Sequence, residues 1–97
     1  MEEELRKVKN WASHGTLRQF YTEVSAKVSG QGYEVELEGD TLTCYRVRKV
    51  GGFLGIGAKR VREPVLKVIR KEEEIIIPED SADEEFVHFL ASSLKQH

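Results

Sequence analysis

This chain has little cysteine, little proline and no long hydrophobic run. Its single cysteine, Cys44, excludes an intramolecular disulfide framework, and no neighbouring base would activate it, so we expect a half-buried strand residue. No apolar stretch approaches the roughly 20 residues of a membrane span. The acidic start of the chain lacks the apolar segment of a signal peptide. These absences predict a cytoplasmic protein that makes no membrane contact.

Catalytic and metal-binding patterns are missing as well. The histidines His14, His88 and His97 are scattered and lack the spacing of metal ligands. The acidic cluster at 83–85 falls in the expected first turn of a helix, where the helix dipole accounts for it. No serine, cysteine or carboxylate pair stands in a recognisable catalytic arrangement. We therefore expect a protein that is not an enzyme and that binds no metal or cofactor.

The spacing of apolar residues predicts three helices. Thr16 and Gln19 have the spacing of a capping box, which marks the start of the second helix. Ser81, or alternatively Asp80, is expected to cap the third helix. The expected helices span residues 2–14, 17–29 and about 82–95.

Strict alternation of apolar and acidic residues at 33–38 predicts a strand. Gly39 and Asp40 then form a turn into a partner strand at 41–50. A two-residue loop places Tyr33 opposite Arg46, Val35 opposite Cys44, and Leu37 opposite Leu42. This register produces one mainly apolar face and one polar face that we expect to be solvated.

Pro64 is expected to interrupt a third strand, because proline cannot donate to a strand ladder. Strand pieces near 58–62 and 65–70, with a bulge or an edge between them, would result. A turn at Lys71 and Glu72 leads to a short strand at 75–77. If Arg70 lies opposite Glu73, then Val68 lies opposite Ile75 and Leu66 lies opposite Ile77. The last two pairs form an apolar face.

These elements predict an α+β protein that folds as a single domain over residues 1–97. The element order is ααββββα. Short connections between the strands favour a mostly antiparallel four-stranded sheet. Its polar outer face indicates two layers, with the helices packed on one face of the sheet only.

Charge is segregated along the chain. Residues 46–71 hold nine of the fifteen basic residues and one acid, Glu63. Residues 72–85 hold eight acids and no base. The net charge of −2 argues against a dedicated DNA coat, but the distribution of charge matters more than the sum.

A glycine-rich loop, residues 51–57, lies inside the basic segment. Its glycines do not follow the Walker order, and a strand rather than a helix is expected after it. They do not follow the Rossmann order either. Gly52-Phe53-Leu54-Gly55 matches the GXXG of KH domains, but that loop joins two helices. The loop therefore does not predict a nucleotide site.

Residues 52–59, GFLGIGAK, resemble the loop G-F-L-G-[IL]-G-x-K in the N-terminal domain of the Jag proteins. Those bacterial proteins carry two RNA-binding modules further along, one of them a KH domain. In that family a helix and a strand precede the loop and a basic strand follows it. This chain differs by adding the hairpin at 33–50 and by lacking the proline and alanine that often follow the loop. The resemblance implies a binding accessory.

The first functional hypothesis is a protein-interaction or homo-oligomerising module. Phe53, Leu54 and Ile56 would form an apolar patch at the tip of the loop, and such patches mark partner sites. The acidic segment of one subunit could also meet the basic segment of another. The alternative is that the tip folds back into the core, with the glycines allowing tight turns.

The second hypothesis is binding of nucleic acid, specifically RNA. Basic residues on adjacent strands could follow a phosphate backbone while Tyr45 or Phe53 stacks on bases. The acidic stripe on the neighbouring strand, Glu34, Glu36 and Glu38, argues against it, unless that stripe neutralises basic residues across the sheet. The basic candidates are Arg46, Arg48, Lys49, Lys59, Arg60 and Arg62.

Overall fold

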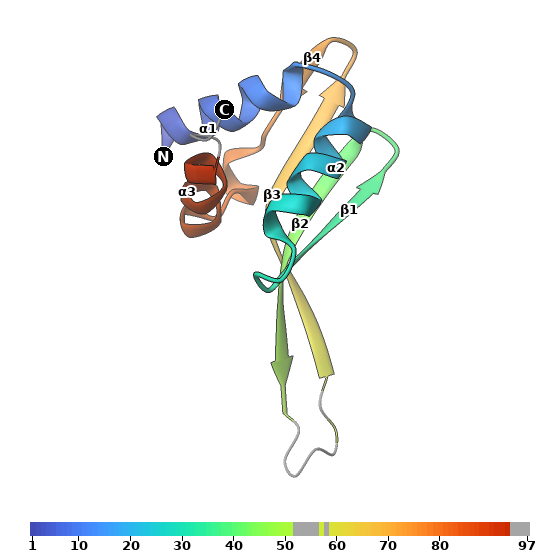
Figure 1. The fold of residues 1–97 in the computed structure, drawn as a ribbon, viewed down its shortest axis with the longest axis vertical. Coiled ribbons are helices and arrows are strands. Elements are labelled where there is room, and N and C mark those ends of the chain that lie inside the picture. Colours follow the sequence, from blue (N-terminus) through green and yellow to red (C-terminus); the bar gives the residue numbers. More distant parts are fainter. Residues whose placement is uncertain (52–56, 58, 94–97) are drawn as a thin grey trace.

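A four-stranded antiparallel sheet with helices on one of its faces forms the protein (Figure 1). The computed structural model describes residues 1–51, 57 and 59–93. The strands follow the chain order β1-β2-β3-β4 across the sheet. The predicted α+β class and the predicted antiparallel sheet are therefore confirmed.

The element bounds agree closely with the expected ones. They are α1 Glu2–Ser13, α2 Leu17–Val28, β1 Tyr33–Glu38, β2 Thr41–Val50, β3 Lys59–Lys71, β4 Glu74–Ile76, a short 3-10 helix η1 at Glu79–Ser81, and α3 Glu84–Ser93.

The second helix begins as its sequence predicts. The Thr16 hydroxyl accepts a hydrogen bond from the Gln19 amide at 3.1 Å, and the Gln19 side-chain oxygen accepts one from the Thr16 amide at 2.9 Å. Both bonds of the capping box are present, so two backbone donors at the start of α2 are satisfied. From this start the apolar stripe of α2 is buried against the sheet: Leu17, Phe20, Val24 and Val28.

The third helix begins later than predicted. Ser81 and Asp80 belong to η1, in which the Ser81 hydroxyl donates to the Pro78 carbonyl at 2.6 Å. The cap is instead Asp83, whose carboxylate accepts from the Phe86 amide at 3.0 Å. The prediction of Ser81 or Asp80 as the cap is wrong, because the chain makes a 3-10 turn after Pro78 before the helix can start.

The β1–β2 register is the predicted one. Tyr33 lies opposite Arg46, Val35 opposite Cys44 and Leu37 opposite Leu42. The side chains of this set point to the face that the helices cover, and Leu42 and Cys44 are fully buried there. The prediction that Cys44 is half-buried is therefore wrong, because the helices cover this face. We call this the helix side of the sheet, and the opposite face the outer face.

Strand β3 runs unbroken past Pro64, so the prediction of two separate strand pieces is wrong. The predicted bulge is confirmed, because Cys44 pairs with Leu66 whereas Tyr45 pairs with Pro64. Val65 is therefore the extra residue. Both Val65 and Leu66 are buried as a result, and the Val65 carbonyl accepts a hydrogen bond from the Asp83 amide at 2.7 Å. The bulge thus links the sheet to the start of α3.

The predicted β3–β4 register is wrong by two residues. Arg70 lies opposite Ile75 rather than Glu73, and Lys71 lies opposite Glu74. The turn is formed by Glu72 and Glu73, with Glu72 in the left-handed region at a φ of 59°. A shift of two residues leaves every side chain on its expected face, and Ile75 is still buried.

The positive φ of Glu72 predicts a stabilising substitution. Glycine adopts this conformation without the steric penalty of a side chain, so Glu72→Gly should raise the free energy of unfolding by about 0.5–1 kcal/mol. Urea denaturation of the variant and the wild type measures the change. Glu73→Gly is the control and should lower stability by a similar amount, since its φ is not positive. Equal effects at the two positions would contradict this turn.

Candidate functional site

Strands β2 and β3 continue beyond the rest of the sheet as a two-stranded ribbon (Figure 1). Strand β1 begins at Tyr33, opposite Arg46, so residues 47–50 and 59–62 pair only with each other in the sheet. The Val47 amide still donates to the Gly32 carbonyl at 2.9 Å, which marks where the ribbon leaves the body. We call residues 47–50 and 59–62 the arm. It contributes to the elongated shape of the molecule, 49 × 28 × 24 Å.

The arm carries positive charge and no negative charge. Its outer face has the pairs Val47–Arg62 and Lys49–Arg60, and its helix side has the pairs Arg48–Val61 and Val50–Lys59. Cations therefore lie on both faces of the ribbon, and each of them is exposed. The predicted adjacency of the two basic strands is confirmed. The five cations of the arm are Arg48, Lys49, Lys59, Arg60 and Arg62.

Arg46 lies at the base of the arm on the helix side. Its guanidinium donates to the Asp83 carboxylate at 2.9 Å and lies 3.9 Å from a Glu63 oxygen. It also lies over the Tyr33 ring, 5.9 Å from the ring centre. The Tyr33 phenol and the Asp83 carboxylate raise the pKa of Arg46, which keeps the guanidinium charged. Arg46 thus fastens the arm to α3.

Arg48 makes the next contact along the helix side. Its guanidinium donates to the other Glu63 oxygen at 2.9 Å, and both side chains are largely exposed. A single carboxylate therefore bridges Arg46 and Arg48. Exposed pairs of this kind contribute little to stability, about 0–1 kcal/mol, so Arg48 can exchange its partner at low cost.

The outer face has its own acid at the base of the arm. Glu34 of β1 forms an ion pair with Arg60, and its second oxygen lies 3.9 Å from Arg62. Arg62 also stacks over the Tyr45 ring at 4.4 Å. The expectation that the acidic stripe neutralises basic residues across the sheet is confirmed at Glu34.

Tyr45 is itself held in place, because its hydroxyl donates to Glu36 at 3.1 Å. The predicted role of Tyr45 in base stacking thus meets a ring that already has Arg62 above it. Lys49 and Lys59 differ from the arginines, since neither makes an ion pair within residues 1–51, 57 and 59–93. The residues predicted as an apolar contact, Phe53, Leu54 and Ile56, lie outside the described residues.

Sequence reasoning missed two contacts that organise this site. It placed Asp83 in a helix turn and did not foresee its pairing with Arg46, 37 residues away. It also did not identify which arginines Glu34 would meet. The β2–β3 register was the missing information. It places Arg62 opposite Val47 and Arg60 opposite Lys49, on the same face as Tyr45, the partner of Glu34.

The described part of the chain contains no group of three or more histidine, cysteine, aspartate or glutamate residues placed to hold a metal ion. None of its helices has both the length and the apolar composition that a membrane crossing requires. Burial raises the pKa of the Cys44 thiol to about 12, so it is protonated at neutral pH and is a poor nucleophile.

No protein-family model, curated protein or solved structure matches this chain. The resemblance of residues 52–59 to the Jag loop stays a prediction.

Removal of the Asp83 carboxylate should weaken both α3 and the base of the arm. Asp83→Ala should lower the free energy of unfolding by about 2 kcal/mol, because it removes a helix cap and a charged hydrogen bond. Asp83→Asn keeps the capping oxygen and should lose about half as much. Urea denaturation checks both values. Asp80→Ala, in the 3-10 turn, is the control, and a loss there equal to that of Asp83→Ala would contradict the assigned cap.

The buried thiol should make stability fall at high pH. The unfolded thiol loses its proton above about pH 8.5, whereas the folded one keeps it until about pH 12. The unfolded state then binds fewer protons, so stability decreases across this range by about 1.4 kcal/mol per pH unit. Cys44→Ala should lack this contribution. Urea melts of both proteins at several pH values measure the difference, and parallel pH profiles would show that the thiol pKa is not raised.

Proposed function

We propose that this protein is a non-enzymatic binding module whose arm binds the phosphate backbone of nucleic acid. One observation carries the proposal: residues 47–50 and 59–62 form a projecting ribbon with five cations and no anion. Cationic side chains that meet phosphates release condensed counterions, and this release drives binding of any nucleic-acid sequence.

The shape of the arm suits this partner. The B-DNA major groove is about 12 Å wide and admits a two-stranded β-ribbon. Other proteins place such ribbons in the major or minor groove of DNA. Because the arm has cations on both faces, it can meet phosphates on both walls of a groove, or a single strand that wraps around it. A flat patch on the body of the sheet could not do this.

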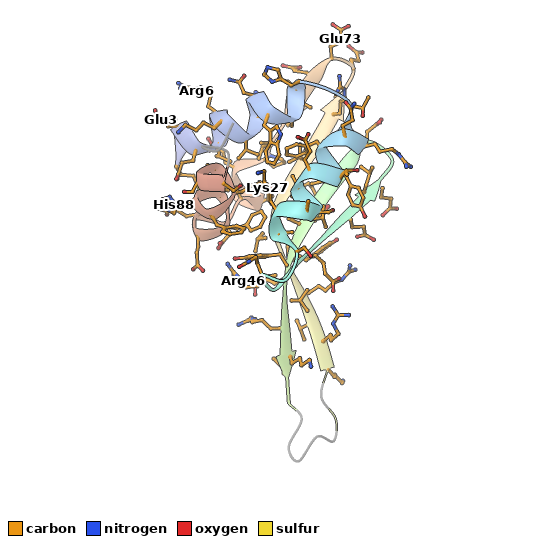
Figure 2. All side chains as sticks on the ribbon, in the orientation of Figure 1. Glu3, Arg6, Lys27, Arg46, Glu73 and His88 are labelled. Atoms are coloured by element: carbon orange, nitrogen blue, oxygen red, sulfur yellow. The ribbon has the colours of Figure 1, made fainter. Side chains whose placement is uncertain are left out.

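The acids of the β3–β4 turn do not oppose binding at the arm. Figure 2 shows Glu73, in this turn, at one end of the molecule and Arg46 near the middle of the long axis, where the arm leaves the body and extends away from Glu73. The long axis is 49 Å, whereas charges in salt are screened over about 8 Å at physiological ionic strength. The acidic turn, Glu72 to Glu74, is therefore electrostatically separate from the arm.

The arm contributes little to the core, which supports a role in binding. The buried residues lie in the helices and in the part of the sheet that the helices cover. A two-stranded ribbon alone is only marginally stable in water, so contact with a partner would stabilise the arm. The side chains of the arm are therefore available for contact with a partner, since they are not needed for packing in the core.

A second candidate function is a protein contact at the end of the arm. Val50 and Val61 lie on the helix side of the ribbon and are 45% and 38% exposed. They adjoin the loop whose Phe53, Leu54 and Ile56 are predicted to meet a protein partner or a second copy of the chain. This candidate predicts a contact that persists at high salt, since apolar burial is not screened.

Charge reversal at the two lysines of the arm tests the proposal. Lys49→Glu with Lys59→Glu should weaken binding of a labelled single-stranded RNA or a DNA duplex at least about tenfold at low salt. The slope of log affinity against log salt should also fall by about 1.4–1.8, the value for two lost phosphate contacts. Fluorescence anisotropy measures both quantities.

Lys67→Glu with Lys71→Glu is the matched control, because both lysines are exposed on the same strand but lie in the body. It should leave affinity nearly unchanged. Equal weakening by the control, or no binding by the wild type at low salt, would overturn the proposal. Binding to a protein partner that survives high salt and is lost in Val50→Ser with Val61→Ser would favour the second candidate.

A further inference from the structure

Two of the three cations on the outer face of the arm are already in contact with an acid of the same chain. Arg60 pairs with Glu34, and Arg62 lies 3.9 Å from the same carboxylate. Glu34 is 35% exposed, whereas Arg60 and Arg62 are 62% and 45% exposed. The carboxylate is thus the more sheltered partner, and both guanidiniums remain within reach of a ligand.

On the basis of the proposed function, we infer that Glu34 is an internal competitor of phosphate. It occupies Arg60 and Arg62 and makes the arm select nucleic acid over protein carboxylates. Acidic proteins and nucleic acids gain different free energies when they displace Glu34 from the arginines, and this difference identifies the class of partner.

A carboxylate on an acidic protein replaces one Arg–carboxylate pair by another of the same kind, so little is gained. A nucleic-acid backbone offers a dense row of phosphates and releases condensed counterions when arginines bind it. Displacement of Glu34 is therefore favourable for a dense phosphate chain, whereas scattered carboxylates gain little by it.

The surroundings hold the two arginines differently. Arg62 keeps its stack on Tyr45 when Glu34 leaves, and the bond from Tyr45 to Glu36 fixes that ring. Within the described residues, Arg60 makes no other ion pair. Arg60 is thus free to swing toward a ligand, while Arg62 presents its guanidinium from a fixed position.

Glu34→Gln tests this inference, with Glu38→Gln as the matched control. Both residues lie on the outer face of β1 and both changes remove one negative charge, but Glu38 pairs with Thr41 at the far end of the strand. Glu34→Gln should tighten binding of a labelled single-stranded RNA about tenfold at about 50 mM salt, because the phosphates no longer have to displace a carboxylate from Arg60 and Arg62. Glu38→Gln should leave the affinity nearly unchanged. Poly-glutamate should compete for the Glu34→Gln variant and not for the wild type.

Variants that lack both arginines test whether the effect of Glu34→Gln depends on them. The gain from Glu34→Gln should vanish when Arg60→Gln and Arg62→Gln are also present, because no guanidinium is then released. Thermal melts verify that each variant is folded. Retention of the gain without these arginines would overturn the inference.

The outcomes separate this inference from the proposed function. Binding by the wild type with equal effects of Glu34→Gln and Glu38→Gln would overturn the inference and leave the proposed function standing. Binding by Glu34→Gln alone would show that Glu34 blocks the arm, and it would overturn both nucleic-acid binding by the unmodified chain and the inferred selectivity. No binding by either protein would overturn both.

Discussion

The structure depends on the contacts of Asp83. Its amide donates to the carbonyl of the bulge residue Val65, and its carboxylate both caps α3 and binds Arg46. The last helix, the bulge in β3 and the base of the arm therefore meet at one residue. A bulge strengthens the local twist of a strand pair. The junction at Asp83 lies close to the point where the sheet ends and the ribbon begins. The arm is thus positioned by the body, although it adds little to the core.

Charge is arranged around the arm in a graded way. At its base, Glu34 and Glu63 hold the arginines on the outer face and the helix side, respectively. Lys49 lies opposite Arg60, and Lys59 lies one pair further out. Neither lysine has such a partner within the described residues. A phosphate backbone could therefore contact the lysines directly and would reach the arginines only by replacing carboxylates. The lysines can bind phosphates without losing an ion pair, whereas binding through the arginines requires loss of their pairs with Glu34 and Glu63. This free-energy cost is a physical basis for selectivity.

Much of the fold follows from local pattern, because each signal depends on neighbouring residues. The capping box of α2 and the two-residue turn at Gly39 and Asp40 determine their elements without long-range information. The β3–β4 register could not be obtained in this way. Two candidate registers differing by two residues bury the same side chains. The observed strand pairs and the left-handed conformation of Glu72 distinguish them, and neither follows from the local pattern.

The sequence predicted which basic residues belong to the candidate site, but not which contacts each of them makes. Six basic residues were equivalent in the sequence, whereas the structure ties Arg46 to α3 and leaves the lysines exposed. That difference arises from contacts across 15 to 37 residues, which no local pattern encodes.

The most direct test of nucleic-acid binding by the arm is an NMR titration of the isotope-labelled protein with single-stranded RNA, at low and then at physiological salt. Binding at the arm predicts amide shifts at residues 47–50 and 59–62 that weaken as salt is added, with α1 and α2 unchanged. Absence of shifts at low salt, or shifts centred on the helices, would contradict the claim that the arm binds nucleic acid.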